Sequence, residues 1–164
     1  MRANPSWAAA ALAAGLLGCA NDAAPPKASQ QDARADRLVN IPLKASSLNA
    51  GESAWATLIG RGDKTDATIM ASGVPPQVSR PIHLYTYIYG GACGSLSKGP
   101  AYSLTGVVLA RSGSASGHMG APFSVANTAD VRLSELRAKP HAIVVKSAPA
   151  DGDLNLFCGN IAAL

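Results

Sequence analysis

One histidine and three tyrosines alternate with aliphatic residues in the segment PIHLYTYIYGGACG, residues 81–94. Successive side chains of a β-strand point to opposite faces, so one face of this segment carries His83, Tyr85, Tyr87 and Tyr89. An imidazole is a donor that copper and zinc favour, whereas an aromatic ring with a polar tip suits a half-covered surface. The segment therefore predicts a strand whose polar face either binds a ligand or packs beneath long loops.

The N-terminal stretch MRANPSWAAAALAAGLLGCAND is typical of an export signal. Arg2 supplies a positive charge, and the apolar run over residues 7–17 is too short to span a bilayer. The run ends in Leu16-Leu17-Gly18-Cys19, which resembles the lipobox of bacterial lipoproteins, where the cysteine is lipidated and the chain is cut just before it. We expect a signal peptide over residues 1–18 and a lipid on Cys19; the alternative is an ordinary secretory signal with an incidental cysteine. Because Ala20 replaces the aspartate that signals inner-membrane retention, the expected location is the outer membrane of a bacterial envelope, facing the periplasm.

The two remaining cysteines are expected to form a disulfide. Lipidation of Cys19 leaves Cys93 and Cys158 from a total of three. An oxidising envelope favours their pairing, which would close a loop of about 65 residues. Two buried free thiols are the alternative.

Residues 19–37 lack large apolar side chains, contain Pro25-Pro26, and predict a flexible tether. The folded domain is then expected over residues 38–164. Loss of Arg2 with the signal leaves 13 Lys and Arg against 10 Asp and Glu, without a basic cluster, so we expect no nucleic-acid partner. Membrane association should depend on the lipid alone. No motif names the protein or small-molecule partner of the domain.

Apolar runs in the domain are short and separated by turn signals, which predicts an all-β fold. The expected architecture is a Greek-key β-barrel or sandwich of seven to eight antiparallel strands. The one helical turn expected lies in ADVRLSELRAKP, residues 129–140. The predicted strands are Val39–Leu43, Ala54–Ile59, Ala67–Ser72, Ile82–Tyr89, Ser103–Leu109, Phe123–Ala126, His141–Lys146 and Leu154–Cys158.

The order of short motifs from about residue 54 onward resembles that of the copper/zinc superoxide dismutases, a family of Greek-key β-barrels. In that family a turn of the type Gly-Leu-x-Pro-Gly precedes a His-x-His strand, a disulfide cysteine follows, and a Leu-Val-Val-His strand comes before a closing Cys-Gly-x-Ile. The corresponding segments here are Ser72-Gly73-Val74-Pro75-Pro76, His83-Leu84-Tyr85, Cys93, Ile143-Val144-Val145-Lys146 and Cys158-Gly159-Asn160-Ile161. The resemblance implies a barrel cross-linked by Cys93 and Cys158.

The ligand set of that family's metal site is largely missing from this chain. The site needs six histidines and an aspartate, and this chain has only His83, His118 and His141. The second position of the His-x-His pair is Tyr85, the Val-Val-His position is Lys146, and the aspartate position near His118 is Ala121. A protonated lysine repels a cation, and a phenol with a pKa near 10 is a poor ligand. We therefore expect no metal cofactor and no ordinary superoxide dismutase activity; one copper or zinc ion held by His83 and His118 is the alternative.

Three functional hypotheses follow. The first is a non-catalytic, superoxide-dismutase-like envelope lipoprotein that serves binding or structure. In its sharper form, His83, Tyr85, Tyr87 and Lys146 line a small polar pocket that binds an anionic or carbonyl group. The second is an enzyme or metal carrier with a single ion. The third is a chordin-type extracellular interaction module, which a strand order other than a Greek key, or a failure of the cysteine pairing, would favour.

Overall fold

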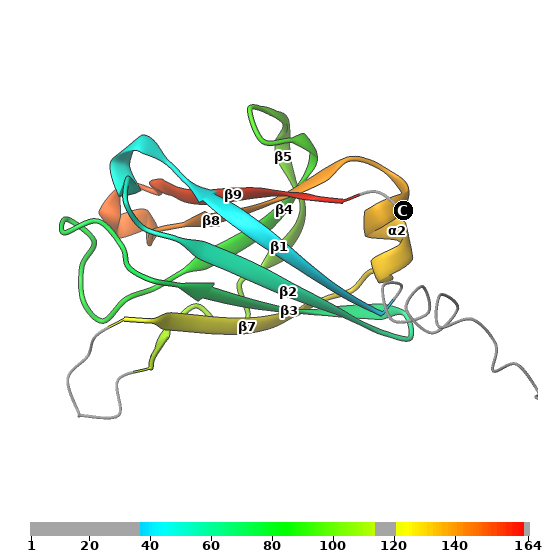
Figure 1. The fold of residues 1–164 in the computed structure, drawn as a ribbon, viewed down its shortest axis with the longest axis horizontal. Coiled ribbons are helices and arrows are strands. Elements are labelled where there is room, and N and C mark those ends of the chain that lie inside the picture. The colour runs from blue at the N-terminus through cyan, green and yellow to red at the C-terminus, as the bar shows by residue number, and fades with distance from the viewer. Residues whose placement is uncertain (1–36, 114–120, 163–164) are drawn as a thin grey trace, which may run out of the picture.

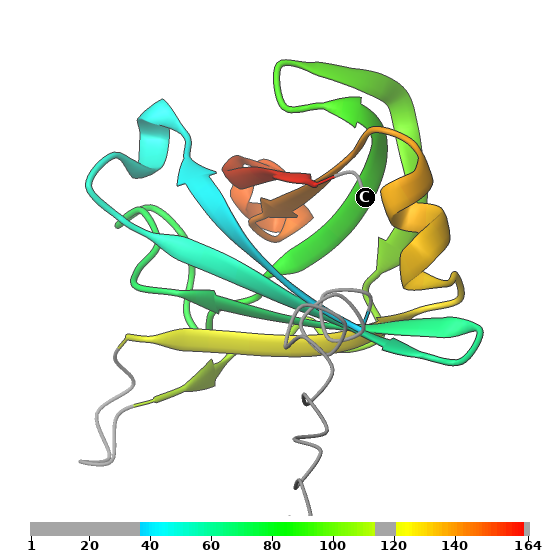
Figure 2. The same ribbon diagram turned by 45° about the vertical axis from the view of Figure 1, so that its right-hand side comes forward.

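The computed structural model describes residues 37–113 and 121–162, so the predicted signal peptide, the lipidation site and nearly all of the predicted tether lie outside the described residues. Nine strands form one curved antiparallel sheet (Figure 1). The sheet curls into a half-barrel, which confirms the all-β fold class (Figure 2). The strands are β1 (Leu38–Ala45), β2 (Ala54–Arg61), β3 (Lys64–Ala71), β4 (Tyr85–Ala92), β5 (Ser95–Leu104), β6 (Arg111–Ser112), β7 (Phe123–Ala129), β8 (His141–Lys146) and β9 (Asn155–Ile161). The short helices are η1 (Ser47–Asn49), α2 (Leu133–Ala138) and η2 (Pro149–Asp151).

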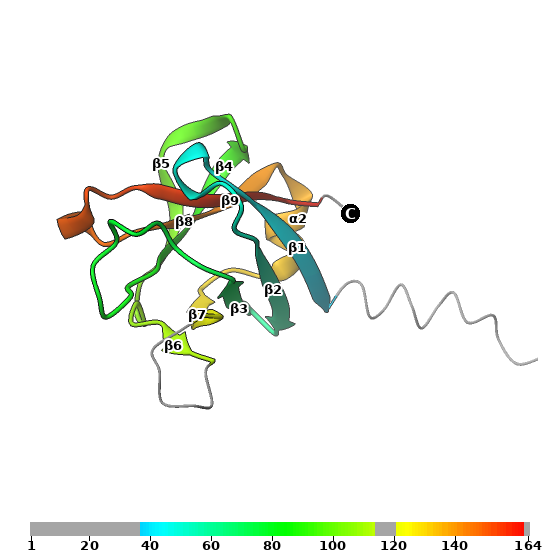
Figure 3. The ribbon, with the colours of Figure 1, turned by 60° about the vertical axis from the view of Figure 1, so that its left-hand side comes forward.

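The strand order is β5-β4-β8-β9-β1-β2-β3-β7-β6. Three neighbouring pairs, β3 with β7, β4 with β8 and β1 with β9, are distant in sequence, and all three are antiparallel. The chain therefore crosses repeatedly between two halves of the sheet, as in a Greek-key arrangement and unlike a simple meander. Figure 3 shows β4, β5, β8 and β9 in one half above β2, β3 and β7 in the other.

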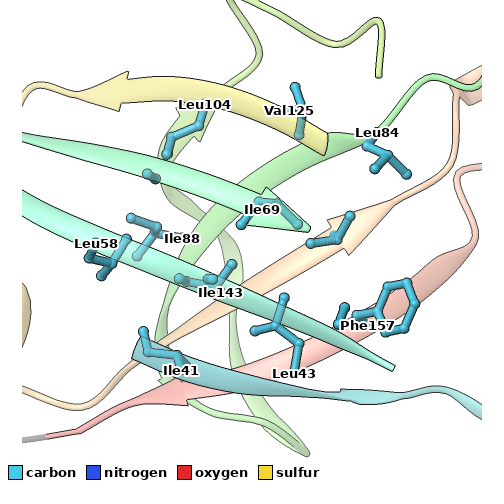
Figure 4. Packing of buried hydrophobic residues seen from close by; sticks show 14 of the residues in the cluster. Ile41, Leu43, Leu58, Ile69, Leu84, Ile88, Leu104, Val125, Ile143 and Phe157 are labelled. Atoms are coloured by element: carbon cyan, nitrogen blue, oxygen red, sulfur yellow. The ribbon is translucent and has the colours of Figure 1, made fainter. Parts of the chain in front are cut away.

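The hydrophobic core lies between these two halves (Figure 4). In β2, β3 and β4 alternate residues point inward, as the period of two in the sequence predicts. Leu58 and Ile69 come from one half, and Ile88, Ile143 and Phe157 come from the other; none is more than 1% exposed. Strands β4 and β8 turn Ile88, Ile143 and Val145 toward this core, so their opposite face is left at the outer surface.

Strand β4 begins at Tyr85, three residues later than predicted. The three preceding residues are still extended, because they pair with the segment 108–110. The Leu84 N–H donates to the Val108 carbonyl at 2.8 Å, and the Ala110 N–H donates to the Ile82 carbonyl at 2.9 Å. His83 therefore keeps the same face as Tyr85, as the predicted strand requires.

The predicted strand Ser103–Leu109 is wrong in position, because β5 covers Ser95–Leu104. Among the described strands, β5 lies at the edge of the sheet and pairs with β4 alone. An edge position tolerates Pro100, which has no N–H to donate, and the pairing is irregular beside it, next to Tyr89. Most β5 side chains are exposed, so the strand lacks the apolar alternation on which the prediction depended.

A side chain connects the segment after β5 to the other half of the barrel. The Asn127 Nδ2 on β7 donates to the Val107 carbonyl at 2.7 Å, and the Asn127 Oδ1 accepts from the Val107 N–H at 2.7 Å. An amide side chain thus provides the two hydrogen bonds that a neighbouring strand would make. This contact brings residue 107 against β7.

The expected helical turn is confirmed as α2, which connects β7 to β8. Leu133 and Leu136 anchor it in the core. At its end the His141 Nδ1 lies 3.0 Å from the Leu136 carbonyl oxygen, so this imidazole is used to hold the helix. Within the described ranges, no helix has the length and apolar character needed to cross a membrane.

Candidate functional site

The candidate site is the outer surface formed by β4 and β8, which we call the tyrosine face. It consists of three cross-strand pairs: Tyr85 with Lys146, Tyr87 with Val144, and Tyr89 with Ala142. Its tyrosines are half-buried, as the predicted alternation requires. Val144 and Ala142 are at most 2% exposed, although they stand apart from the main core cluster. Directly opposed side chains contact each other across a sheet, so the tyrosine rings shield these two residues and make the face a packed surface.

Lys146 is the most constrained polar group of the tyrosine face. Its Nζ lies 2.6 Å from Oδ2 of Asp153, and only 17% of its side chain is exposed. The same Nζ lies 5.9 Å from the centre of the Tyr87 ring, within the range of a cation–π interaction. The hydrogen bond to Asp153 raises the pKa of Lys146 above its usual 10.5, although burial alone would lower it. The lysine is therefore a protonated structural cation at neutral pH.

Tyr87 is held as a protonated phenol. Burial raises the pKa of Tyr87 above its usual 10.0, and the carboxylate of Asp153 raises it further. The Tyr87 and Tyr89 rings meet edge to face, with their centres 6.3 Å apart. These contacts fix the rings on the surface, so the hydroxyls can donate to or accept from a ligand but are poor metal donors.

Replacement of Asp153 by Asn is expected to lower the free energy of unfolding by about 1 kcal/mol at neutral pH, because the half-buried Lys146 ammonium loses its carboxylate. The pKa of Lys146 is raised in the folded state, so the contribution of the pair is complete below 10.5 and is lost as pH rises through the folded-state pKa. Urea unfolding of the wild type and Asp153→Asn from neutral pH to above 10.5 should therefore give free energies that converge at the alkaline end.

The matched control for this series is Tyr87→Phe, because the raised pKa of Tyr87 also makes the free energy of unfolding depend on pH in the alkaline range. In a Tyr87→Phe background, the free-energy difference caused by Asp153→Asn should remain at neutral pH and still disappear at alkaline pH. Free energies that stay parallel across the whole range would contradict a role for the lysine charge.

The two histidines that the structure describes, His83 and His141, lie apart. His83 lies at the end of the tyrosine face, where residue 83 forms an isolated bridge with Leu109 on the side away from β8. His141 is used at the end of α2, and the resemblance to the superoxide dismutases aligns it with no metal ligand. His118 lies outside the described residues. Over residues 37–113 and 121–162, no three His, Cys, Asp or Glu side chains are grouped so that they could hold a metal ion.

The donor set of the tyrosine face does not fit copper or zinc. A zinc site needs three or four imidazole, thiolate or carboxylate ligands in place, and here one imidazole, His83, stands beside phenols and an ammonium. The Asp153 carboxylate is already bound to Lys146. Hence Tyr85 and Lys146, which the resemblance aligns with copper ligands, provide hydrogen-bonding and aromatic surface.

Of the four residues predicted to line a pocket, the structure brings three together. Tyr85 and Lys146 are cross-strand neighbours, and Tyr87 lies against the lysine, while His83 is one alternate position further along the strand. Ligand binding by this group stays a prediction. Sequence reasoning missed Asp153, which neutralises Lys146 and would compete with an anionic ligand. The Asp-Gly-Asp turn at residues 151–153, where the chain reverses between β8 and β9, was the available signal.

A disulfide between Cys93 and Cys158 borders the tyrosine face, as predicted. Cys158 on β9 lies opposite Val144, so the bridge continues the outer surface beyond β8. The Cys93 N–H donates to Oδ1 of Asn160 at 2.7 Å. The bridge and this hydrogen bond fasten the β4–β5 hairpin to β9, and thereby fix the strand that carries the tyrosines.

The outer surface of β4 and β8 thus carries phenols, one lysine–aspartate pair and a bordering disulfide. Its chemistry is hydrogen bonding, aromatic contact and a locally neutralised cation. No family model, no curated protein and no solved structure matches the chain.

Proposed function

We propose that the protein is a lipid-anchored protein of the bacterial envelope in which a superoxide-dismutase-like barrel serves binding or structure instead of catalysis. The observation that carries this proposal is the composition of the tyrosine face. At the positions that the resemblance aligns with copper ligands, Tyr85 faces Lys146, and the lysine is held by Asp153. Among the described residues, this surface groups no three side chains of the kinds that hold copper or zinc.

Two features support an envelope location. The motif Leu16-Leu17-Gly18-Cys19 predicts a lipid anchor, and β1 begins at Leu38, which leaves a spacer between this anchor and the barrel. The Cys93–Cys158 bridge belongs to an oxidising compartment. With Ala20 after the lipidated cysteine, the outer membrane facing the periplasm is the proposed site.

The tyrosine face is the proposed contact surface for a partner protein or a small molecule. Tyrosine combines a large apolar ring with a hydroxyl and is enriched at binding interfaces. The Tyr87 and Tyr89 rings already contact each other, and Lys146 contacts the Tyr87 ring, so these tyrosines would lose little side-chain entropy when a partner binds. Because Asp153 neutralises the lysine, a carbonyl or hydroxyl group suits this surface better than an anion.

Metal content tests the non-catalytic part of the proposal. The full chain, exported in a bacterium supplied with copper and zinc and purified in neutral detergent, is expected to contain far less than one equivalent of either metal. The double variant His83→Ala, His118→Ala should have the same low content, because the described part of the chain offers no third donor beside His83 on the tyrosine face. Stoichiometric copper or zinc that the double variant loses would contradict the proposal and establish the single-metal alternative.

A further inference from the structure

A second polar surface lies where the chain enters the barrel, and we propose that it binds the phosphate group of a membrane lipid. The surface is a shallow groove of about 400 Å³, which we call the arginine groove. Its lining residues are Arg37, Gly60, Gly62, Arg132, Leu133 and Ser134. They come from the start of β1, the β2–β3 hairpin and the start of α2, which lie together at one end of the barrel (Figure 1).

Contacts among these elements give the groove a fixed shape. The Gly60 N–H donates to the Arg37 carbonyl at 2.8 Å, which joins the start of β1 to the hairpin. A Cβ on Gly60 would lie 3.4 Å from Leu133 Cβ, in ordinary van der Waals contact, so the start of α2 packs directly against the hairpin. The buried Thr65 hydroxyl donates to the Val131 carbonyl at 2.7 Å and fixes the chain just before Arg132.

The two arginines of the groove differ from the other cations nearby. Arg61 is paired with Asp66, and Lys64 lies 2.7 Å from Asp130. Neither Arg37 nor Arg132 makes an ion pair with any residue that the structure describes, and none of the groove-lining residues is acidic. The groove is therefore lined by two arginines that have no ion-pair partner among the described residues, together with two glycines.

This arrangement matches the chemistry of a phosphate group. A guanidinium is a planar fork of donors that binds phosphate oxygens in pairs. The Ser134 hydroxyl lines the same groove and adds a neutral donor. Two arginines on one groove suit a single anion with several oxygens, and the groove volume of about 400 Å³ leaves room for it.

The position of the groove points to a lipid headgroup as the source of the phosphate, a step that rests on the proposed lipid anchor. Only residues 20–36 separate Arg37 from the proposed bilayer anchor at Cys19, a reach of at most about 65 Å even when fully extended. An anchored chain therefore keeps this end of the barrel near the bilayer. Phosphates of anionic lipids attract arginines at a membrane surface, so the groove would orient the barrel on the membrane in addition to the tether.

The test measures binding of a soluble lipid to the full-length, lipidated protein in neutral detergent. Dihexanoylphosphatidylglycerol below its micelle concentration is titrated, and the amide resonances of Gly60 and Gly62 are followed by NMR. Saturable shifts of both are expected. The double variant Arg37→Gln, Arg132→Gln should bind the probe about tenfold more weakly or worse, because it loses both charge-assisted contacts.

A double variant of equal charge, Lys44→Gln, Lys98→Gln, is the control, because both lysines are exposed and stand away from the groove-lining residues. It should bind the probe as tightly as the wild type does. If it lost as much affinity as the arginine double variant, the probe would be attracted by the net positive charge of the protein, and the proposed site would be overturned. Inorganic phosphate is titrated separately, and saturation by phosphate with no response to the lipid would overturn the lipid assignment. Intact mass reports the lipid on Cys19 independently, so a failed anchor is distinguished from a failed groove.

Discussion

Removal of the disulfide by the double substitution Cys93→Ser, Cys158→Ser is expected to lower the free energy of unfolding by about 4 kcal/mol. The disulfide joins two residues that are 65 positions apart in the sequence. Without this bond, the unfolded chain has a much larger conformational entropy. The bond also joins the β4–β5 hairpin to β9, which the strand order places two strands apart from β4. Chemical denaturation of the oxidised wild type and the double variant measures the difference directly.

Reduced and alkylated wild-type protein is the first comparison, and it should be nearly as unstable as the double variant. The single variants Cys93→Ser and Cys158→Ser should lose the same amount as the double variant, because either one opens the loop. If the double variant lost less than about 1 kcal/mol, the chain-entropy account of this bridge would be wrong. In that case the tyrosine face would depend on β8 and on Asn160 for its position.

Much of the fold follows from alternation within single strands. The predicted boundaries of β8 match the structure, and the helical turn at α2 is confirmed. The face of His83 and the tyrosines was also predictable, because Ile82, Leu84 and Ile88 are buried at the alternate positions. A period of two records which face of a strand meets the core, so it predicts the exposed face of β4 as well as the buried one.

The remaining features depend on partners that a local pattern does not record. β5 is an edge strand, and its polar side chains and Pro100 gave no alternation to recognise. β6 has only two residues and exists through its pairing with β7. Asp153 reaches Lys146 because a turn reverses the chain between β8 and β9, and the arginine groove joins residues from three separate elements. Tertiary contacts of this kind override local propensity.

The arginine groove and the lysine end of the tyrosine face lie at different ends of β8. His141 begins this strand next to α2, which borders the arginine groove, whereas Lys146 ends it. Five residue steps along a strand place Lys146 roughly 17 Å further from α2. A barrel oriented by the arginine groove would therefore hold the Lys146–Asp153 end of the tyrosine face away from the bilayer, where a periplasmic partner can reach it.

The double substitution Tyr85→His, Lys146→His is expected to create a metal site that binds about one copper or zinc ion per chain. Residues 85 and 146 are direct cross-strand neighbours, so their side chains begin roughly 5 Å apart. His83 precedes residue 85 by two positions on the same face and provides the third imidazole. Asp153, freed from its lysine, adds a carboxylate at the border of the site. Calorimetric titration with zinc, together with copper electron paramagnetic resonance, measures the gain.

Each substitution alone is the control, because two imidazoles make a much weaker site than three. Adding His83→Ala to the double variant should abolish the gain, which separates a site at the tyrosine face from binding elsewhere on the chain. A folded double variant that binds no more metal than the wild type would mean that Tyr85 and Lys146 do not occupy ligand positions, and the proposed relation to the superoxide dismutases would lose its main support. A gain in metal binding would mean that two substitutions are enough to create a metal site on the tyrosine face, and that the barrel holds residues 83, 85 and 146 in the geometry that a metal ion requires.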